Sequence, residues 1–296
     1  MEDTRIGVVG LGHVGRALAQ RASAAGLMVQ GYDVSPAAVA AARAGGIRVA
    51  PDLPALLRMA SIALVCVFDD VQLFDVVGSI GAHAGSGVGP ELLINSATCS
   101  PAAVEAAAAD LGQLGIAFIE LPLSGSSVQI RDGDALGLVG AEDAILTKYA
   151  AVVSMLSPQF FHVGPPGAGA RAKLASNLVL GLNRSALAEG IVLAERLGLD
   201  ATRFLDLLRR SPAYSRAVDT VGERMVSREF APRPRLAQHR KDLVLILEHA
   251  ERAALDLPLA RAHLGLLDRA VALGLGERDN AAVIAALTTP TDAAAP

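Results

Sequence analysis

The sequence predicts an α/β protein in two parts, a doubly wound sheet over residues 1–163 and an all-α domain over residues 164–296. Three observations predict this division. Short apolar runs alternate with alanine-rich helical stretches up to about residue 163, which is typical of a parallel sheet with helices on both faces. Beyond Gly164-Pro-Pro-Gly167 only helical periodicity remains. The chain has 296 residues, enough for two such domains.

Seven apolar runs are the expected strands, because each is short and bounded by residues that favour turns. Helices are expected between them, for example over Pro101–Leu114 and Ala144–Leu156. In the second part, a long interdomain helix begins after Gly167 and four or five shorter helices follow it, with a disordered tail over Thr288–Pro296. The expected strands are Arg5–Val9, Met28–Tyr32, Ile62–Phe68, Leu92–Asn95, Ala117–Glu120, Leu136–Val139 and Phe160–Val163.

A Gly-x-Gly-x-x-Gly loop, Gly10-Leu-Gly12-His-Val-Gly15, follows the first expected strand and precedes a helix-prone stretch. Gly10 permits a tight turn, Gly12 lets the backbone approach a pyrophosphate, and Gly15 lets the helix lie close to the strand. The helix N-terminus offers N–H donors and a positive dipole end to the phosphates. In this context the loop predicts a dinucleotide-binding domain of the Rossmann type rather than a glycine-rich turn without a ligand.

Asp33 stands 23 residues after Gly10, at the end of the second expected strand. Its carboxylate can accept hydrogen bonds from the ribose hydroxyls and would repel a 2′-phosphate. Because no cation follows in Val34-Ser35-Pro36, the sequence favours NAD as cofactor, with NADP possible. The residues expected to contact the cofactor in this domain are Gly10, Leu11, Gly12, His13, Val14, Gly15, Asp33 and Phe68.

The composition argues against several classes of protein. A net charge of −4 leaves no basic surface for nucleic acid. No apolar run reaches the length of a membrane span without charges or prolines, and the N-terminal region has no signal-peptide pattern, so we expect a cytoplasmic protein without a membrane partner. Cys66 and Cys99 show no paired spacing, which argues against a disulfide framework and against a metal site.

Three further segments could carry chemistry, and each also has a plainer explanation. The stretch Thr98-Cys-Ser-Pro101 follows a strand, and its Ser-Pro pair could simply cap a helix. The loop Ser124-Gly-Ser126 could hold a carboxylate on its backbone N–H groups, although from composition alone a turn without a ligand is the simpler explanation. Lys173 and Asn177 share one helix face, where a desolvated lysine can exchange a proton with a hydroxyl or carbonyl. A lone lysine is more often a solvated charge.

Taken in order, these motifs resemble the β-hydroxyacid dehydrogenase family, which includes 3-hydroxyisobutyrate dehydrogenase and tartronate semialdehyde reductase. The motifs are the glycine loop, Thr-x-Ser-Pro, Pro-x-Ser-Gly and the helical Gly-x-Gly-x-x-x-Lys-x-x-x-Asn. The resemblance covers essentially the whole chain, including Lys241-Asp-Leu243 and the closing Glu277-Arg-Asp-Asn280. Four motifs in this order are far more specific than any one of them.

The resemblance implies a role for each matching residue. Lys173 matches the family's catalytic lysine, and Asn177 matches the asparagine that helps to orient the substrate. The substrate-binding residues are Ser124, Gly125 and Ser126. Thr98 matches the threonine near the nicotinamide, and Lys241 matches a lysine near cofactor and substrate, although the spacing before Lys241 differs from that of the family.

The chain also departs from the family pattern. In the related 6-phosphogluconate dehydrogenases a glutamate seven residues after the lysine serves decarboxylation, and Leu180 stands there in this chain. The resemblance therefore implies alcohol–carbonyl interconversion without loss of CO₂. Further departures are Val14 for Met, Asn95 for Asp, Ala97 for Ser, Glu120 for Asp, Leu121 for a small residue, Ser126 for Gly, and Ser176 for Asn or His.

The expected function is that of an NAD-dependent oxidoreductase that interconverts a short 3-hydroxy acid and its semialdehyde or keto acid. One alternative is an imine reductase-like NAD(P)H enzyme, against which Lys173 argues because those proteins usually lack the lysine. A second alternative is a non-catalytic nucleotide-binding protein on the same fold. The resemblance also implies a homodimer or homotetramer formed through the helical domain.

Overall fold

The computed structural model describes residues 4–82, 89–231 and 235–288. Its contacts divide the chain into two compact units, Met1–Lys173 and Leu174–Pro296, and each has a hydrophobic core. The division falls within one helix, α8 (Ala168–Arg196), so the first turns of α8 belong to the first unit. A mixed α/β unit followed by a helical unit confirms the predicted fold class.

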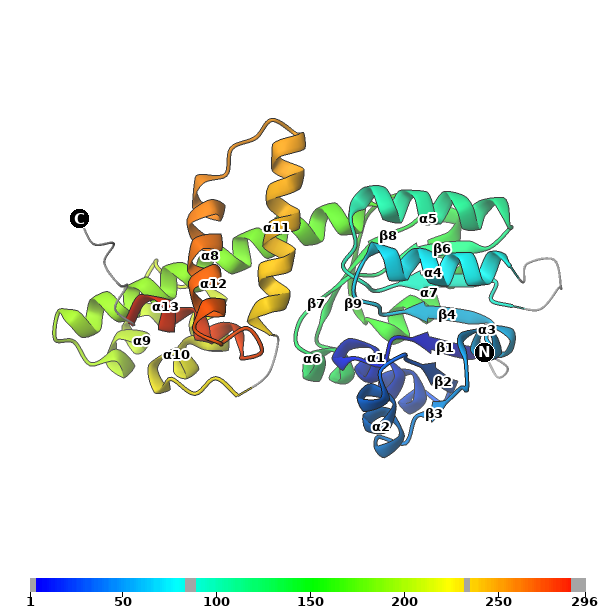
Figure 1. Ribbon diagram of the computed structural model, residues 1–296, viewed down its shortest axis with the longest axis horizontal. Helices are drawn as coiled ribbons and strands as arrows, with labels where there is room; N and C mark the ends of the chain where they lie inside the picture. The colour runs from blue at the N-terminus through cyan, green and yellow to red at the C-terminus, as the bar shows by residue number, and fades with distance from the viewer. Residues whose placement is uncertain (1–3, 83–88, 232–234, 289–296) are drawn as a thin grey trace. The chain divides into compact units, whose positions relative to one another are not determined.

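The first unit is built on one sheet, whose strands are β1 (Arg5–Val9), β2 (Met28–Tyr32), β3 (Arg48–Val49), β4 (Ile62–Val65), β5 (Leu92–Asn95), β6 (Ala117–Glu120), β7 (Leu123–Ser124), β8 (Leu136–Gly140) and β9 (Gln159–Gly164). Among the described residues the strand order is β3-β2-β1-β4-β5-β6-β8-β7, with β9 beside β8 (Figure 1). The chain builds β2 and β3 on one side of β1 and then crosses to β4 on its other side. The point where the strand order reverses, which is where such folds bind ligands, therefore lies between β1 and β4.

Two strand pairs depart from the purely parallel sheet that the sequence predicts. β8 lies antiparallel to β6, where Glu120 is opposite Gly140, and antiparallel to β7. The chain between β7 and β8 holds only the short helix α6 (Ser127–Asp132), which is too little for the crossover that a parallel pair needs. Such short elements give no readable periodicity, which is why β3, β7 and α6 were absent from the sequence prediction.

Helices cover both faces of the sheet (Figure 1). One face packs against α1 (His13–Ala24), α2 (Pro36–Ala44), α6 and α7 (Asp143–Leu156), and the other against α3 (Leu53–Met59), α4 (Asp70–Gly81) and α5 (Pro101–Gln113). Successive residues of one strand pack into the hydrophobic cores on opposite faces of the sheet, because side chains alternate across a strand. In β4, Ile62 and Leu64 face the first group of helices while Ala63 and Val65 face the second. A strand buried on both faces appears in the sequence as a continuous apolar run.

β4 ends at Val65, earlier than the Phe68 expected from the apolar run. Cys66 N still donates to Val9 O, after which the chain leaves the sheet. Asp69 then caps α4, and its carboxylate accepts a hydrogen bond from Gln72 N at 3.0 Å. Phe68 consequently lies in the loop beyond the carboxyl end of β4.

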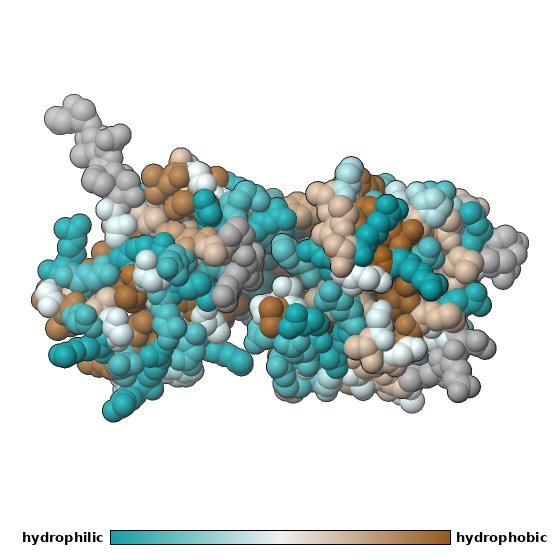
Figure 2. Space-filling view, turned by 90° about the horizontal axis from the view of Figure 1, so that it is seen from below, coloured by the Kyte–Doolittle hydropathy of each residue, from teal (hydrophilic) through white to brown (hydrophobic). Residues whose placement is uncertain are grey.

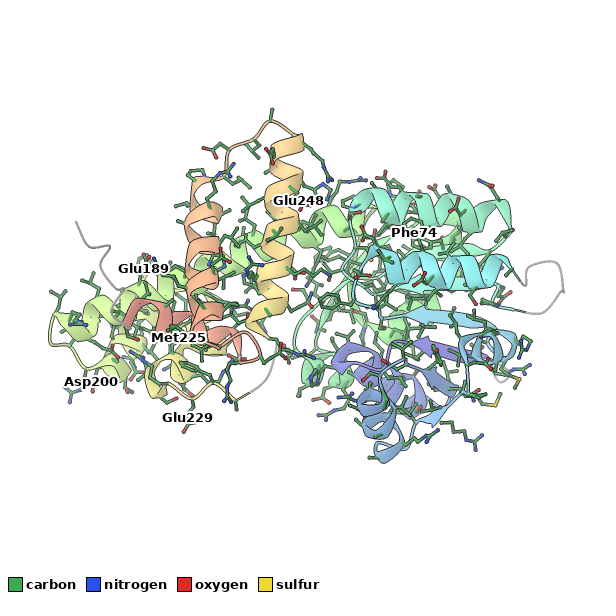
Figure 3. All side chains as sticks on the ribbon, viewed as in Figure 1. Phe74, Glu189, Asp200, Met225, Glu229 and Glu248 are labelled. Atoms are coloured by element: carbon green, nitrogen blue, oxygen red, sulfur yellow. The ribbon has the colours of Figure 1, made fainter. Side chains whose placement is uncertain are left out.

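The second unit is helical, as predicted, and comprises most of α8 with α9 (Ala201–Arg209), a π-helical turn η2 (Val218–Gly222), α10 (Glu223–Ser227), α11 (Leu236–Arg252), α12 (Pro258–Ala272), a 3₁₀ turn η3 (Asn280–Ile284) and α13 (Ala285–Thr288). Its described residues hold one isolated β-bridge, between Arg235 and Asp279. Met225 of α10 is fully buried in the core of this unit (Figure 3). Thr288 ends α13, and the rest of the predicted disordered tail, residues 289–296, lies outside the described residues.

No helix within the described ranges is long and apolar enough to cross a membrane.

Candidate active site

The glycine loop after β1 meets the loop after β4 backbone to backbone. Gly10 has φ +91°, a left-handed conformation that favours glycine, and a Cβ atom there would lie 2.4 Å from Cys66 O. A Cβ atom at Gly15 would lie 1.9 Å from Gly10 O, so α1 approaches the strand as closely as the motif requires. Burial between these segments raises the pKa of the Cys66 thiol to about 12, which favours its protonated form at neutral pH.

Gly12 differs from Gly10 and Gly15, because a Cβ atom at Gly12 would meet nothing within 4 Å. Gly12 is the N-cap residue of α1, and no side chain caps this helix. The first N–H groups of a helix need acceptors, and a phosphate is a suitable one. An open backbone beside an uncapped helix N-terminus therefore fits the pyrophosphate of a dinucleotide.

Asp33 follows β2 and is fastened to the glycine loop. Its Oδ2 accepts a hydrogen bond from Leu11 N at 2.6 Å, and its Oδ1 accepts one from Ser35 N at 2.7 Å. Each carboxylate oxygen has a second lone pair, so both can still accept from a ribose hydroxyl. These residues together fit an NAD-type cofactor: Gly12 and α1 would hold the phosphates and Asp33 the adenosine ribose.

The loops after β4 and β5 open at the same edge of the sheet, because both strands are parallel to β1. Phe68 is exposed, and its N–H donates to Gln72 Oε1 at 2.9 Å. Thr98 is half-buried beyond β5. Asn95, which departs from the family's Asp, accepts a hydrogen bond from Ala97 N, and its buried Nδ2 has no partner among the described residues.

The predicted substrate loop begins at β7. Gly125 is exposed, but a Cβ atom there would lie 2.9 Å from Ala135 Cβ, so a side chain would not fit without a shift. Ser126 caps α6 in a reciprocal arrangement, in which its N–H donates to Gln129 Oε1 at 2.9 Å and its Oγ accepts from Gln129 N at 3.3 Å. The Ser126 N–H expected to hold a carboxylate is thus already engaged by Gln129.

Lys173 lies beside this loop. Its Nζ donates a hydrogen bond to Leu123 O at 2.7 Å, directly before Ser124. The side chain is half-buried, which separates Lys173 from an ordinary solvated lysine. The structure therefore brings together the predicted acid/base and the predicted substrate loop, which are 50 positions apart along the chain.

In the helical unit, Asn177 is held by a carboxylate that sequence reasoning assigned no role. Asn177 Nδ2 donates to Asp242 Oδ2 at 3.2 Å, and Gln238 Nε2 donates to Asp242 Oδ1 at 3.2 Å. Asn177 and Asp242 are both buried. A carboxylate only accepts, so Asp242 selects which end of the Asn177 amide faces it. Asp242 directly follows Lys241, and only the Lys-Asp dipeptide of the family motif could have pointed to it.

Glu120, at the end of β6, is the second residue that sequence reasoning did not assign. It is 1% exposed, and its Oε2 accepts hydrogen bonds from Gly167 N at 3.0 Å and Gly169 N at 2.9 Å. Burial raises the pKa of Glu120 to about 7, against the opposing effect of these backbone donors and of the Arg171 charge. Glu120 is thus a carboxyl group that titrates near neutral pH at the start of α8.

Two family models match the chain. Residues 5–164 match the NAD binding domain of 6-phosphogluconate dehydrogenase, and residues 167–287 match the model described as NAD-binding of NADP-dependent 3-hydroxyisobutyrate dehydrogenase.

Similar proteins align over nearly the whole chain. The 2-hydroxy-3-oxopropionate reductase of Escherichia coli is 26% identical over 96% of this chain and 97% of its own. The 2-(hydroxymethyl)glutarate dehydrogenase of Eubacterium barkeri is 27% identical over 95% of this chain and 93% of its own. The structure of Mycobacterium tuberculosis 3-hydroxyisobutyrate dehydrogenase with L-serine has a TM-score of 0.83 at 26% identity, covering 97% of this chain and 99% of that one. The chain belongs to the β-hydroxyacid dehydrogenase family, whose members are NAD(P)-dependent oxidoreductases.

Alanine at two positions of the glycine loop should separate folding from cofactor binding. Gly12→Ala places its methyl group in open space, so the free energy of unfolding should change by less than about 1 kcal/mol. NADH affinity should fall about tenfold or more, because the methyl keeps the pyrophosphate from the backbone. Gly10→Ala should cost more than about 2 kcal/mol, because it combines a left-handed φ with the Cys66 O contact. Urea unfolding and NADH fluorescence titrations test both, and wild-type affinity in Gly12→Ala would contradict the expectation.

Glu120 should give the wild type a pH dependence of stability that Glu120→Gln lacks. Its pKa is 4.5 when exposed and about 7 in the folded protein, so folding favours the protonated form. The stabilising contribution is complete below pH 4.5 and is lost as the pH rises through about 7, on the order of 3 kcal/mol in total. Relative to Glu120→Gln, the wild type should lose thermal stability between about pH 5 and about pH 8. Parallel Tm profiles for the two proteins would show that Glu120 does not titrate in this range.

Proposed function

We propose that this protein oxidises the hydroxyl group of a short 3-hydroxy acid with NAD, reversibly and without loss of CO₂. The observation that carries the proposal is the hydrogen bond from Lys173 Nζ to Leu123 O, which holds an acid/base candidate beside the Ser124–Gly125 loop. The relatives named above act on hydroxy acids or their oxo counterparts. Leu180 stands where the decarboxylating enzymes of the resemblance have a glutamate, which supports a reaction that keeps the carboxyl group.

The proposed chemical step needs one proton acceptor and one hydride acceptor. NAD, when bound, supplies the hydride acceptor. Lys173, as the neutral amine, takes the proton of the substrate hydroxyl, and in the reverse direction Lys173 returns it to the carbonyl oxygen. Leu123 O accepts one N–H of the amine, which keeps Nζ in place beside the substrate loop.

Substrate orientation is assigned to two sets of residues. The Gly125 N–H and the Ser124 side chain hold the substrate carboxylate, because the Ser124 N–H lies in the β7–β8 ladder, and Ser126 joins them only if its N–H leaves Gln129. Asn177 orients the reacting oxygen, with its amide held in one orientation by Asp242. The residues proposed to contact the cofactor are Gly10, Leu11, Gly12, His13, Val14, Gly15, Asp33, Phe68, Thr98 and Lys241.

We further propose that the protein is a cytoplasmic homodimer or homotetramer. Exposed apolar side chains lie at Val179 and Leu193 on α8 and at Leu197 just beyond its end, and apolar patches gather on the surface of each unit (Figure 2). A helix face of this kind is suited to bury against a second copy. Sedimentation equilibrium tests the assembly, and a monomer at micromolar concentration would contradict it. Neither Cys66 nor Cys99 forms a disulfide, which is consistent with a reducing compartment.

The cofactor should be NAD(H) rather than NADP(H). Asp33 presents a negative charge where NADP carries its 2′-phosphate, so kcat/KM should be higher with NAD. Asp33→Ser should reduce the difference in kcat/KM between NAD and NADP, chiefly by lowering the value for NAD. The substitution removes both the acceptor for the ribose hydroxyls and the charge that repels the 2′-phosphate. Steady-state kinetics with both cofactors decide the matter. A wild type that prefers NADP would refute the assignment.

Removal of the lysine should abolish the chemistry and leave cofactor binding intact. Lys173→Ala should lower kcat by on the order of 10²–10⁴-fold, the usual contribution of a general acid/base. NADH affinity should remain close to that of the wild type, because Lys173 lies outside the glycine loop. An unchanged kcat would contradict the role of Lys173 as the general acid/base. A variant that is inactive only because it no longer binds NADH would contradict it as well.

The substrate should need its carboxylate. A screen of C3–C6 hydroxy acids, including hydroxyisobutyrate, glycerate and threonate, should identify a substrate by the change in NADH absorbance. The amide or primary-alcohol analogue of that acid should have a kcat/KM lower by about tenfold or more, because a hydrogen bond to an ionised acceptor is roughly twice as strong as one to a neutral acceptor. Equal kcat/KM for acid and analogue would favour an imine or simple carbonyl substrate. No turnover with any acid would favour a non-catalytic nucleotide-binding protein.

A further inference from the structure

The start of α8 is held by a side chain from the sheet. Pro165 and Pro166 have no N–H groups, so the first donors near the helix start are those of residues 167–169. Ala168 N donates to Pro165 O at 3.0 Å. Gly167 N and Gly169 N both donate to Glu120 Oε2. One carboxylate oxygen thus takes two of the backbone donors that open the helix, a role usually filled by a local capping residue.

Two neighbouring glycines restrict the position of the Glu120 carboxylate. A Cβ atom at Gly140, opposite Glu120 on β8, would lie 2.4 Å from Glu120 Oε2. A Cβ atom at Gly169 would lie 2.8 Å from the same oxygen. Two glycines therefore make room for a glutamate, which is one methylene longer than the aspartate of the family pattern.

The same two segments are joined a second time. Three residues beyond Glu120, Leu123 O accepts the hydrogen bond from Lys173 Nζ, and Lys173 lies one helical turn beyond Gly169. The strand segment 120–125 and the helix segment 167–173 are thus connected at both ends. Because a helix turn is rigid, the position of Gly169 determines where the Lys173 side chain starts.

Stability alone does not account for a carboxyl group at this position. Burial raises the pKa of Glu120 to about 7, so at neutral pH its ionised form lowers the stability of the fold. Arg171 of α8 is the cation that faces it, and Arg171 forms an ion pair with Glu105 of α5. Residues that cost stability and persist only in a supporting environment gather at functional sites.

We propose that Glu120 is a positioning residue, which sets the start of α8 so that Lys173 Nζ is held at Leu123 O beside the substrate loop. The importance of this position for catalysis rests on the function proposed above. Replacement of a purely structural residue would disturb the packing of the whole unit. Replacement of Glu120 should instead change the position of the α8 start and the environment of Lys173.

Chemical labelling of the full chain tests the proposal without any substrate. The chain has three lysines, Lys148, Lys173 and Lys241, so acetylation by limiting acetic anhydride is readily mapped by mass spectrometry. Labelling is carried out at about pH 8, where wild-type Glu120, with its pKa of about 7, is mostly ionised. In Glu120→Gln, the labelling rate of Lys173 relative to exposed Lys148 should then change by about threefold or more, because a neutral acceptor binds the helix start about half as strongly. The Lys241 to Lys148 ratio should stay as in the wild type. An unchanged Lys173 ratio overturns the proposal, and so does a change that extends equally to Lys241.

Glu105→Gln is the matched control. It removes a carboxylate at the same helix end, where Glu105 pairs with the Arg171 side chain, whereas Glu120 accepts from the backbone N–H groups of Gly167 and Gly169. Its Lys173 ratio should equal that of the wild type, and an effect as large as that of Glu120→Gln would reduce the proposal to a general charge effect. If Glu120→Gln does not fold, Glu120→Asp replaces it, since the shortened side chain retreats from both glycine N–H groups. Wild-type labelling in Glu120→Asp then overturns the proposal.

Kinetics separate this inference from the proposed function. With an active hydroxy acid, Glu120→Gln should lower kcat by about tenfold or more while NADH affinity stays unchanged, as expected for a displaced acid/base. Altered Lys173 labelling with unchanged kcat would overturn the positioning role. A wild type without turnover would refute the proposed function, while the labelling comparison would still decide whether Glu120 positions Lys173.

Discussion

A Cβ atom at residue 15 would lie 1.9 Å from Gly10 O, and one at residue 10 would lie 2.4 Å from Cys66 O. No side chain fits between these segments, so the loops after β1 and β4 meet backbone to backbone at the point where the strand order reverses. This close approach brings the uncapped start of α1 to the edge of the sheet, where Asp33 is bonded to Leu11 N. The parallel strands deliver the loops after β4 and β5 to the same edge, and the proposed cofactor site is built from them.

The link between α8 and the sheet depends on a buried carboxylate that is energetically unfavourable when ionised. Glu120 accepts two backbone donors at the helix start, yet burial still raises its pKa to about 7. Ionised Glu120 therefore lowers the stability of the fold while it defines the position of the helix start. A defined position matters here because Lys173, one turn further along α8, has to reach Leu123 O. The usual capping residues are short polar side chains next to the helix in sequence, which would fasten the helix to itself and not to the substrate loop.

Two of the departures from the family pattern acquire physical explanations in the structure. Ser126, where the family has a glycine, caps α6 together with Gln129. Its N–H donates to Gln129 and can bind a ligand only after that hydrogen bond breaks. Glu120, where the family has an aspartate, is accommodated by Gly140 and Gly169. Nothing in the structure explains Ala97 in place of serine. These differences lie around the loop that would bind substrate, which is where relatives with different substrates are expected to diverge.

The sequence by itself determined the two-part fold, the dinucleotide loop and the family, because periodicity and motif spacing are local properties of the chain. It located Lys173 and Ser124 as candidates, and it missed β3, β7 and α6, which are too short to show a period. Only the tertiary structure decided that Ser126 is a capping residue, that Asp242 holds Asn177, and that Glu120 holds α8. Gly167 and Glu120 are 47 positions apart, and Lys173 and Leu123 are 50 apart. Contacts at such separations depend on how strands and helices stack, and no local pattern encodes which side chain meets which backbone group.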